Sequence, residues 1–266
     1  MYNQHWGLKQ SPFGGSDRAF YDSAAQEEAL ARIDYLISQN RRLGILTGRD
    51  GVGKTTLLNH VAYEAKRRRS PSTCINALGM DQQEFVMNVA QSLGAIHHLE
   101  NSPAVVWRKL FDRFQTNRFQ HLDTLIVVDD AHEAESEVLN AIVRFVQWYP
   151  AAKSRVTVLL SANTDRVELL GTRLLQLSDL NIELEPWDQE DTIGYIRFAL
   201  EQAGAERELF DVRAVEEIQR LSEGVPRRVV QLAELALVAG AGQELDRIDA
   251  DTISAVDDEL RVPVAG

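Results

Sequence analysis

The chain has 266 residues, 44% of them hydrophobic and 26% charged, a balance typical of a globular protein with one large and one small domain. Its net charge of −12 argues against a protein whose whole surface attracts nucleic acid or anionic membrane. The longest apolar runs have the length of strands, far short of the ~20 residues that cross a bilayer, and the polar start does not resemble a signal peptide, so we expect no membrane insertion.

Strand and helix patterns alternate through the first 186 residues. Amphipathic spacing predicts a helix over 24–39, and an apolar strand over 43–47 precedes a second helix over 56–69. Further strands are predicted over 72–78, 124–129, 156–161 and 181–184, with helices over 81–93, 103–119 and 136–148 between them. Continuous apolar runs are typical of parallel strands buried on both faces, so the pattern predicts an α/β fold around a parallel sheet.

The alternation of strand and helix patterns ends after residue 186, where the sequence predicts helices only. Asp188 is expected to cap the first of them, and others are predicted over 212–221, 226–239 and 249–260. Pro226 gives a start signal, and Gly240 and Gly242 are expected to end the helix that it opens. The sequence therefore predicts an α/β domain over 1–186 and a small helical lid domain over 187–266.

The most specific motif lies between the first strand and the next helix. Gly48, Arg49, Asp50, Gly51, Val52, Gly53, Lys54 and Thr55 form the pattern G-x-x-x-x-G-K-T, and Thr56 continues into the helix. A glycine-bent loop at a helix N-terminus aims backbone N–H groups and the helix dipole at phosphates. Lys54 is expected to contact the β- and γ-phosphates and Thr55 to offer its hydroxyl to Mg²⁺. The motif predicts a nucleoside triphosphate site.

Two adjacent carboxylates, Asp129 and Asp130, end the strand predicted over 124–129. Burial explains the apolar strand but not two acidic residues at its carboxyl end, where ligands bind in open α/β sheets. Asp129 is expected to hold Mg²⁺, and Asp130 to position or activate the attacking water. The alternative is that the pair caps the turn that follows.

Two further polar positions fit the same site. Asn163 follows the strand over 156–161, beside the expected γ-phosphate, although an Asn there is by itself typical of a turn. Arg227 and Arg228 open a predicted helix, where the dipole disfavours cations. An anionic phosphate reached when the lid closes would explain them, and a solvated arginine is the alternative for one of the two.

The remaining cationic clusters have simpler explanations. Lys66–Arg69 end the helix over 56–69, where the dipole favours cations, so a solvated helix end explains them. The single cysteine, Cys74, cannot form an internal disulfide and fits a reducing, cytoplasmic compartment.

The motifs together resemble a known family. The opening residues Met1, Tyr2, His5–Leu8 and Ser11–Phe13, the loop, the Asp-Asp-Ala-His box and the segment Gly224–Arg228 look like the AAA+ ATPases of the general secretion pathway protein A type. Those are related to transposition-helper and origin-recognition ATPases. The resemblance implies a P-loop NTPase sheet of five strands in the order 5-1-4-3-2, a helical lid, ATP with Mg²⁺, and assembly into homo-oligomers.

The resemblance also assigns roles to individual residues. Trp6 and Phe13 would line the adenine pocket, Asn163 would be the first sensor, and Pro226 and Arg227 would contact the nucleotide, Arg227 as the second sensor. The alternative for Trp6 and Phe13 is an N-terminal segment that its aromatic side chains hold against the core.

Three departures limit what the resemblance implies. Asp130 stands where the family usually has Glu, and its side chain is one methylene shorter. Because misplacing the attacking water by about 1 Å can cost on the order of 100-fold in rate, hydrolysis is expected to be slow. The arginine that reaches a neighbouring subunit falls on Leu177, with Arg173 or Arg166 as substitutes. No membrane segment or peptidoglycan-binding domain follows, which argues against a direct role in building a secretion pore.

The function predicted from these residues is an ATPase that couples ATP binding and hydrolysis to assembly with itself and with an unidentified protein partner. One alternative is a DNA-associated helper ATPase, which the acidic total charge disfavours. The other is a nucleotide-gated adaptor that does not hydrolyse ATP, which Asp130 and the displaced arginine favour.

Overall fold

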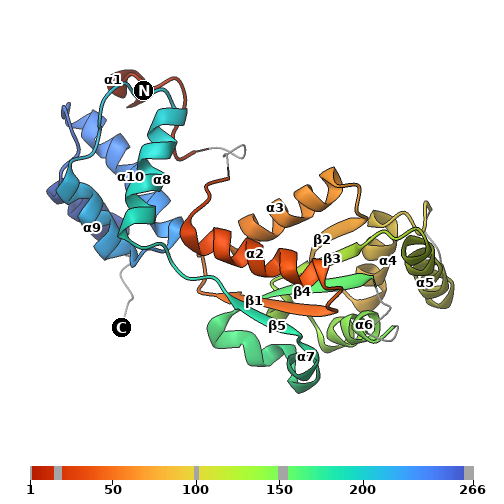
Figure 1. Ribbon diagram of the computed structural model, residues 1–266. Helices are drawn as coiled ribbons and strands as arrows, with labels where there is room; N and C mark the ends of the chain where they lie inside the picture. Colours follow the sequence, from red (N-terminus) through yellow and green to blue (C-terminus); the bar gives the residue numbers. More distant parts are fainter. Residues whose placement is uncertain (1, 15–19, 99–101, 149–154, 261–266) are drawn as a thin grey trace. The chain divides into compact units, whose positions relative to one another are not determined.

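The chain folds as two compact units in the computed structural model, which describes residues 2–14, 20–98, 102–148 and 155–260. One unit comprises Gln26–Leu184, and the other combines Met1–Ala25 with Glu185–Gly266 (Figure 1). The chain passes from the larger unit to the helical unit between Leu184 and Glu185, within two residues of the predicted boundary at 186. The N-terminal 25 residues, which were predicted to belong to the α/β domain, are instead part of the helical unit. They join it because their aromatic side chains complete its core.

A five-stranded parallel sheet forms the centre of the larger unit. Its strands are β1 (Leu43–Gly48), β2 (Ser72–Asn76), β3 (Thr124–Asp129), β4 (Val156–Asn163) and β5 (Leu180–Glu183). They lie in the order β2-β3-β4-β1-β5, and every neighbouring pair is parallel. This is the predicted order 5-1-4-3-2 read from the opposite edge, so the α/β fold and its strand order are confirmed.

Helices cover both faces of this sheet, with α3 on one side and α6 on the other (Figure 1). The helices of the unit are α2 (Ala24–Ser38), α3 (Lys54–Arg67), α4 (Gln82–Ser92), α5 (Pro103–Phe119), α6 (Ser136–Val146) and α7 (Thr172–Leu177), with short 3-10 helices over Ala131–Glu133 and Thr164–Leu170. Alternate side chains of β3 point to opposite faces, so Ile126 and Val128 join one core with α4, α5 and α6.

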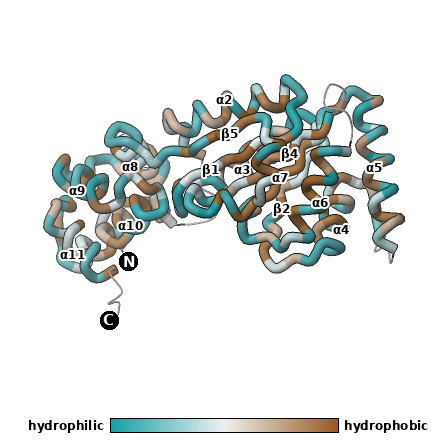
Figure 2. The backbone as a smooth tube through the Cα atoms, turned by 90° about the horizontal axis from the view of Figure 1, so that it is seen from below, coloured by the Kyte–Doolittle hydropathy of each residue, from teal (hydrophilic) through white to brown (hydrophobic). Residues whose placement is uncertain are grey.

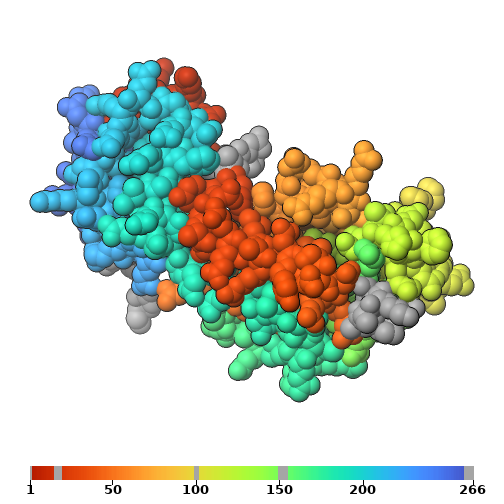
Figure 3. Space-filling view, in the orientation of Figure 1, coloured from red at the N-terminus to blue at the C-terminus, as the bar shows by residue number. Residues whose placement is uncertain are grey.

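Burial on both faces explains why the strands are apolar along their whole length. Val127 and Val128 are adjacent on β3, and neither has exposed surface. The hydropathy view shows the strands as hydrophobic segments between more hydrophilic helices (Figure 2). In the space-filling view, α2 forms part of the outer surface of this unit (Figure 3).

The helical unit contains α1 (Tyr2–Trp6), α8 (Gln189–Gln202), α9 (Val212–Ser222), α10 (Pro226–Gly242) and α11 (Ala250–Leu260). The predicted cap of α8 is confirmed, because the Asp188 side chain accepts a hydrogen bond of 2.8 Å from the backbone of Asp191. The prediction for α10 is wrong at its end. Gly240 and Gly242 lie inside this helix, and a Cβ on Gly240 would meet Ile248 and Trp6, so this glycine permits close packing rather than ending the helix.

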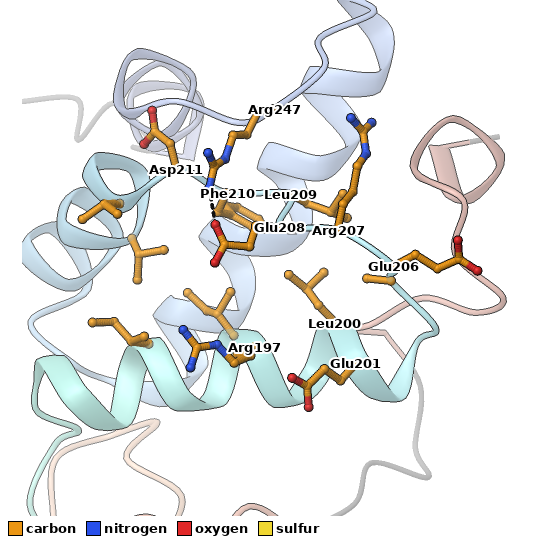
Figure 4. A pocket seen from close by; sticks show the side chains of 15 residues that line it. Arg197, Leu200, Glu201, Glu206, Arg207, Glu208, Leu209, Phe210, Asp211 and Arg247 are labelled. Carbon is orange, nitrogen blue, oxygen red and sulfur yellow. Dashed lines mark hydrogen bonds and ion pairs between the residues drawn. The ribbon is translucent and has the colours of Figure 1, made fainter.

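This unit is also hollowed on one side. A cavity of about 440 Å³ lies beside α8 and the segment that leads to α9, with apolar side chains such as Leu200 and Leu209 in its wall. Arg247 donates a hydrogen bond of 2.5 Å to Glu208 at the edge of the cavity (Figure 4). None of the residues predicted to bind nucleotide lines it.

Candidate nucleotide-binding site

The predicted phosphate-binding loop connects β1 to α3. Gly53 is the cap residue of α3 and has a φ of 107°, a backbone conformation that glycine adopts at little cost. No side chain caps this helix, since glycine has no side-chain oxygen to accept the first N–H groups. These N–H groups and the positive end of the helix dipole are therefore available to an anion.

Lys54, the first residue of α3, is buried, with only 6% of its surface exposed. Its Nζ donates hydrogen bonds of 3.0 Å to the carbonyl oxygens of Gly48 and Arg49, and one of 2.7 Å to Asn163 Oδ1. Asn163 reaches this point because β1 and β4 are neighbours and Gly48 lies opposite Asn163 in their register. The structure thus brings the predicted phosphate lysine and the predicted first sensor into contact.

The acidic residues at the end of β3 lie beside the start of α3. Thr55 donates a hydrogen bond of 2.7 Å to Asp129 Oδ2, so the two predicted Mg²⁺ ligands are in contact. Asp130 follows with a φ of 49°, in the left-handed region that Asp tolerates better than most residues. Its side chain makes no capping hydrogen bond, which argues against the alternative that the pair caps the turn.

The electrostatic surroundings of Asp130 suit a proton acceptor. Burial, followed by the negative charge of Asp129, raises the pKa of the Asp130 carboxyl above the ordinary aspartate range, while the charges of His132 and Lys54 oppose the shift. A carboxylate whose proton affinity is raised accepts a proton from water more readily than an exposed one.

Sequence reasoning missed one residue at this point, Ser161. It has no exposed surface, and its hydroxyl donates a hydrogen bond of 2.6 Å to Asp129 Oδ1. The hydroxyl oxygen of Ser161 in turn accepts a hydrogen bond of 2.8 Å from the backbone N–H of Asp130. The available signal was a polar residue two positions before Asn163, because residues i and i+2 share a face of a strand.

The residues fit both an anionic phosphate and a magnesium ion. The Lys54 ammonium donates to the carbonyl oxygens of Gly48 and Arg49 and to Asn163 Oδ1, and a lysine at this position of the loop can also donate to the β- and γ-phosphate oxygens. Thr55 and Asp129 offer the hard oxygen donors that Mg²⁺ prefers. Among the described residues, no group of three or more His, Cys, Asp or Glu side chains could hold a metal ion.

Comparison with known proteins identifies the family. The model of a family described as AAA domain matches residues 37–170, which span half of the chain and include the loop, the acidic pair and Asn163. The chain belongs to the AAA domain family. The predicted resemblance to AAA+ ATPases is therefore confirmed.

Two curated relatives match most of this AAA chain. It is 24% identical to general secretion pathway protein A of Aeromonas hydrophila over 245 residues, which cover 90% of this chain and 45% of that protein. It is 25% identical to DNA polymerase III subunit tau of Salmonella typhimurium over 250 residues, 91% of this chain and 37% of that protein. The chain thus spans less than half the length of these relatives.

The fold also matches solved structures. The ORC2 protein of Aeropyrum pernix, determined as ADPNP and ADP complexes, superposes with a TM-score of 0.70 at 16% identity, over 94% of this chain and 72% of that one. At this identity the likeness concerns the fold, which supports the predicted P-loop NTPase architecture. No helix in the described part of the chain is long and apolar enough to cross a membrane.

The segment Gly224–Arg228 contains two arginines with different surroundings. Arg228 donates a short hydrogen bond to the buried carboxylate of Asp257 and another of 2.9 Å to Gln231, so its place at the start of α10 has a structural explanation. Pro226 is buried, whereas Arg227 is exposed. The role of Arg227 as a nucleotide sensor stays a prediction.

The two aromatic residues predicted to line the adenine pocket lie in the core of the helical unit. Trp6 donates a hydrogen bond of 2.8 Å to the carbonyl of Leu237, and Phe13, fully buried, packs against Tyr195 and Phe210. These contacts support the alternative of a segment held against the core. Contact of either ring with adenine stays a prediction.

The two arginines suggested to act in a neighbouring subunit both lie near the end of β4 in the chain. Arg166, in the 3-10 helix that follows β4, donates to Glu133 at 2.5 Å, and Arg173, on α7, donates to Gln147 at 2.8 Å. Both are exposed, and Leu177 is half-buried at the end of α7. Which arginine acts on a neighbour stays open.

Proposed function

We propose that this chain binds ATP with Mg²⁺, hydrolyses it slowly, and uses the nucleotide to control its assembly with further copies and with a protein partner. One observation carries the proposal: Lys54 contacts Asn163 and Thr55 contacts Asp129 at the carboxyl ends of β1, β3 and β4, where ligands bind in open α/β sheets, and this supports roles for the four residues in binding phosphate and Mg²⁺. The ADPNP and ADP complexes of a protein with the same fold support it.

Each side chain of the site has a separate role in the proposed reaction. Lys54 and the N–H groups at the start of α3 stabilise the negative charge on the phosphates. Thr55 and Asp129 hold Mg²⁺, which supplies further charge stabilisation at the phosphate oxygens. Asn163 orients the attacking water or the terminal phosphate, and Asp130 accepts a proton from that water. Because the Asp130 side chain is one methylene shorter than Glu, we expect slow turnover, as befits a switch.

Nucleotide control of assembly rests on residues outside the loop. Arg227, exposed at the first turn of α10, would act as the second nucleotide sensor, and Arg173 or Arg166 would act on a neighbouring copy. The similarity to general secretion pathway protein A makes a component of a secretion pathway the first partner to test. The similarity to a DNA polymerase III subunit makes duplex DNA the alternative partner to include in the test.

The test begins with ATP binding by the wild type and by Lys54→Ala. Lys66→Ala is a matched control, because this lysine lies on the same helix but is exposed in its last turn. Lys54→Ala should weaken ATP binding by at least about 100-fold, and Lys66→Ala should bind as the wild type does. Equal binding by all three proteins would overturn the proposal.

Turnover is then measured across a range of protein concentrations, with Asp130→Asn as the inactive control and duplex DNA added in parallel. Activity per molecule that rises with concentration supports hydrolysis coupled to assembly. Stimulation by DNA would favour the DNA-associated alternative. Tight ATP binding with no turnover under any condition would leave the nucleotide-gated adaptor.

A further inference from the structure

Ser161 occupies an unusual position for a polar side chain. It lies on the central strand β4, between β3 and β1, and has no exposed surface. A buried hydroxyl costs free energy unless it is hydrogen-bonded, and Ser161 makes two such bonds, both to the acidic residues that end β3.

The direction of each hydrogen bond follows from the chemistry of the groups. The backbone N–H of Asp130 can only donate, so Ser161 Oγ accepts from it at 2.8 Å. The hydroxyl proton of Ser161 is then directed to Asp129 Oδ1 at 2.6 Å. Asp129 Oδ2 accepts from Thr55 at 2.7 Å, so both oxygens of Asp129 are acceptors, as in the ionised carboxylate.

The hydroxyl of Ser161 also constrains the backbone conformation of Asp130. This residue has a φ of 49°, and a non-glycine residue holds this conformation when its surroundings stabilise it. The hydrogen bond from its N–H to Ser161 is such a constraint. Since the side chain of Asp130 projects from this backbone, the orientation of its carboxylate depends on Ser161.

We propose that Ser161 is the positioning residue of the ATPase site, a proposal that rests on the function proposed above. Its hydroxyl fixes Asp129 Oδ1 and thereby orients the carboxylate that, together with Thr55, would hold Mg²⁺. It also fixes the backbone that carries Asp130. With Asn163 two residues further along, β4 then supplies one side chain that aligns the acidic pair and one that contacts Lys54.

The test compares Ser161→Ala with a control from the same strand. Thr157 lies on β4, is 4% exposed, and donates a hydrogen bond of 2.8 Å to the carbonyl of Arg41. Thr157→Val therefore also removes one buried hydroxyl, but at the opposite end of the strand from the acidic pair. Ser161→Thr retains the hydroxyl and serves as the conservative variant.

Three quantities are measured for each protein: the unfolding midpoint, the Mg²⁺ concentration that half-maximally supports binding of a fluorescent ATP analogue, and kcat with KM. Loss of a partner that orients a metal ligand typically weakens metal affinity 10- to 100-fold. We expect Ser161→Ala to need at least about tenfold more Mg²⁺ and to lose more in kcat than in KM, and Ser161→Thr to restore both. Thr157→Val should lower the unfolding midpoint and leave the Mg²⁺ requirement unchanged.

The outcomes separate this proposal from the function on which it rests. If the wild type binds the analogue with Mg²⁺ and Ser161→Ala matches it in Mg²⁺ requirement and kcat, the positioning role is refuted and the proposed function stands. An equal rise in Mg²⁺ requirement for Thr157→Val would show a general effect of the strand and also refute it. If the wild type binds no nucleotide, both proposals fail.

Discussion

Gly224 gives a prediction in which backbone strain and steric clash can be separated. It has a φ of +71°, and a Cβ built on it would lie 1.9 Å from the carbonyl oxygen of Trp187. Gly7 has the same φ of +71°, but a Cβ there would meet nothing within 4 Å. Both residues belong to the helical unit, so Gly7→Ala reports the cost of the backbone conformation, and Gly224→Ala adds the clash.

The expected magnitudes follow from the contacts. The left-handed conformation costs an alanine about 1–2 kcal/mol at either site. At Gly224 the backbone must also move away from Trp187, which disturbs the 2.9 Å hydrogen bond from Trp187 N–H to the Gly224 carbonyl and the 3.0 Å hydrogen bond from Gln219 to the Trp187 carbonyl. Each is worth about 1 kcal/mol. We therefore expect Gly224→Ala to lower the free energy of unfolding by about 3–4 kcal/mol.

The assay is urea unfolding of the full chain followed by far-UV circular dichroism, in which the helical unit contributes strongly. Gly7→Ala should shift the midpoint slightly and Gly224→Ala at least about twice as far, in proportion to the estimates above. Equal shifts for the two variants would refute the reasoning, because the clash with Trp187 would then contribute nothing.

Two other predictions concern charge and burial. Arg228→Ala leaves the buried Asp257 carboxylate without its arginine and should destabilise the protein by about 2–3 kcal/mol in thermal unfolding, whereas Arg227→Ala should change stability by less than about 0.5 kcal/mol and weaken ATP binding. A larger destabilisation by Arg227→Ala would contradict this assignment. Burial raises the pKa of the Cys74 thiol from 9.0 to about 11, so at pH 8 the thiolate fraction, and with it the alkylation rate, should be about 100-fold lower in the native protein than in urea. Equal rates measured with iodoacetamide would contradict it.

The sequence predicted the sheet well because its signals are local. The apolar run Leu125–Val128 predicts a buried strand, and the structure confirms it. The two aspartates that follow predict ligand binding at this edge of the sheet, and Asp129 there accepts a hydrogen bond from Thr55 of the loop. The short helices over Thr164–Leu170 and Thr172–Leu177 were not predicted, since segments of six or seven residues are too short for a helical period to stand out.

Where the sequence left alternatives open or missed a residue, the deciding partners lie far away in the chain. Trp6 and Phe13 read equally well as pocket or core residues, and only their contacts with Leu237, Tyr195 and Phe210 place them in the helical core. Ser161 was missed for the same reason, because its role depends on β3 lying beside β4. Such pairings depend on the tertiary structure, which local patterns do not specify.

The division of the helical unit between two distant parts of the chain has a consequence for its biosynthesis. About 160 residues separate Ala25 from Glu185, and at 5–20 residues per second a ribosome needs roughly 10–30 s to make them. Throughout that time the aromatic side chains of the N-terminal segment lack the helices that bury them. The sheet unit can fold first, whereas the N-terminal segment cannot bury its aromatic side chains until α8–α11 have been synthesised. A chaperone that binds exposed aromatic residues would therefore have the most time to bind this segment.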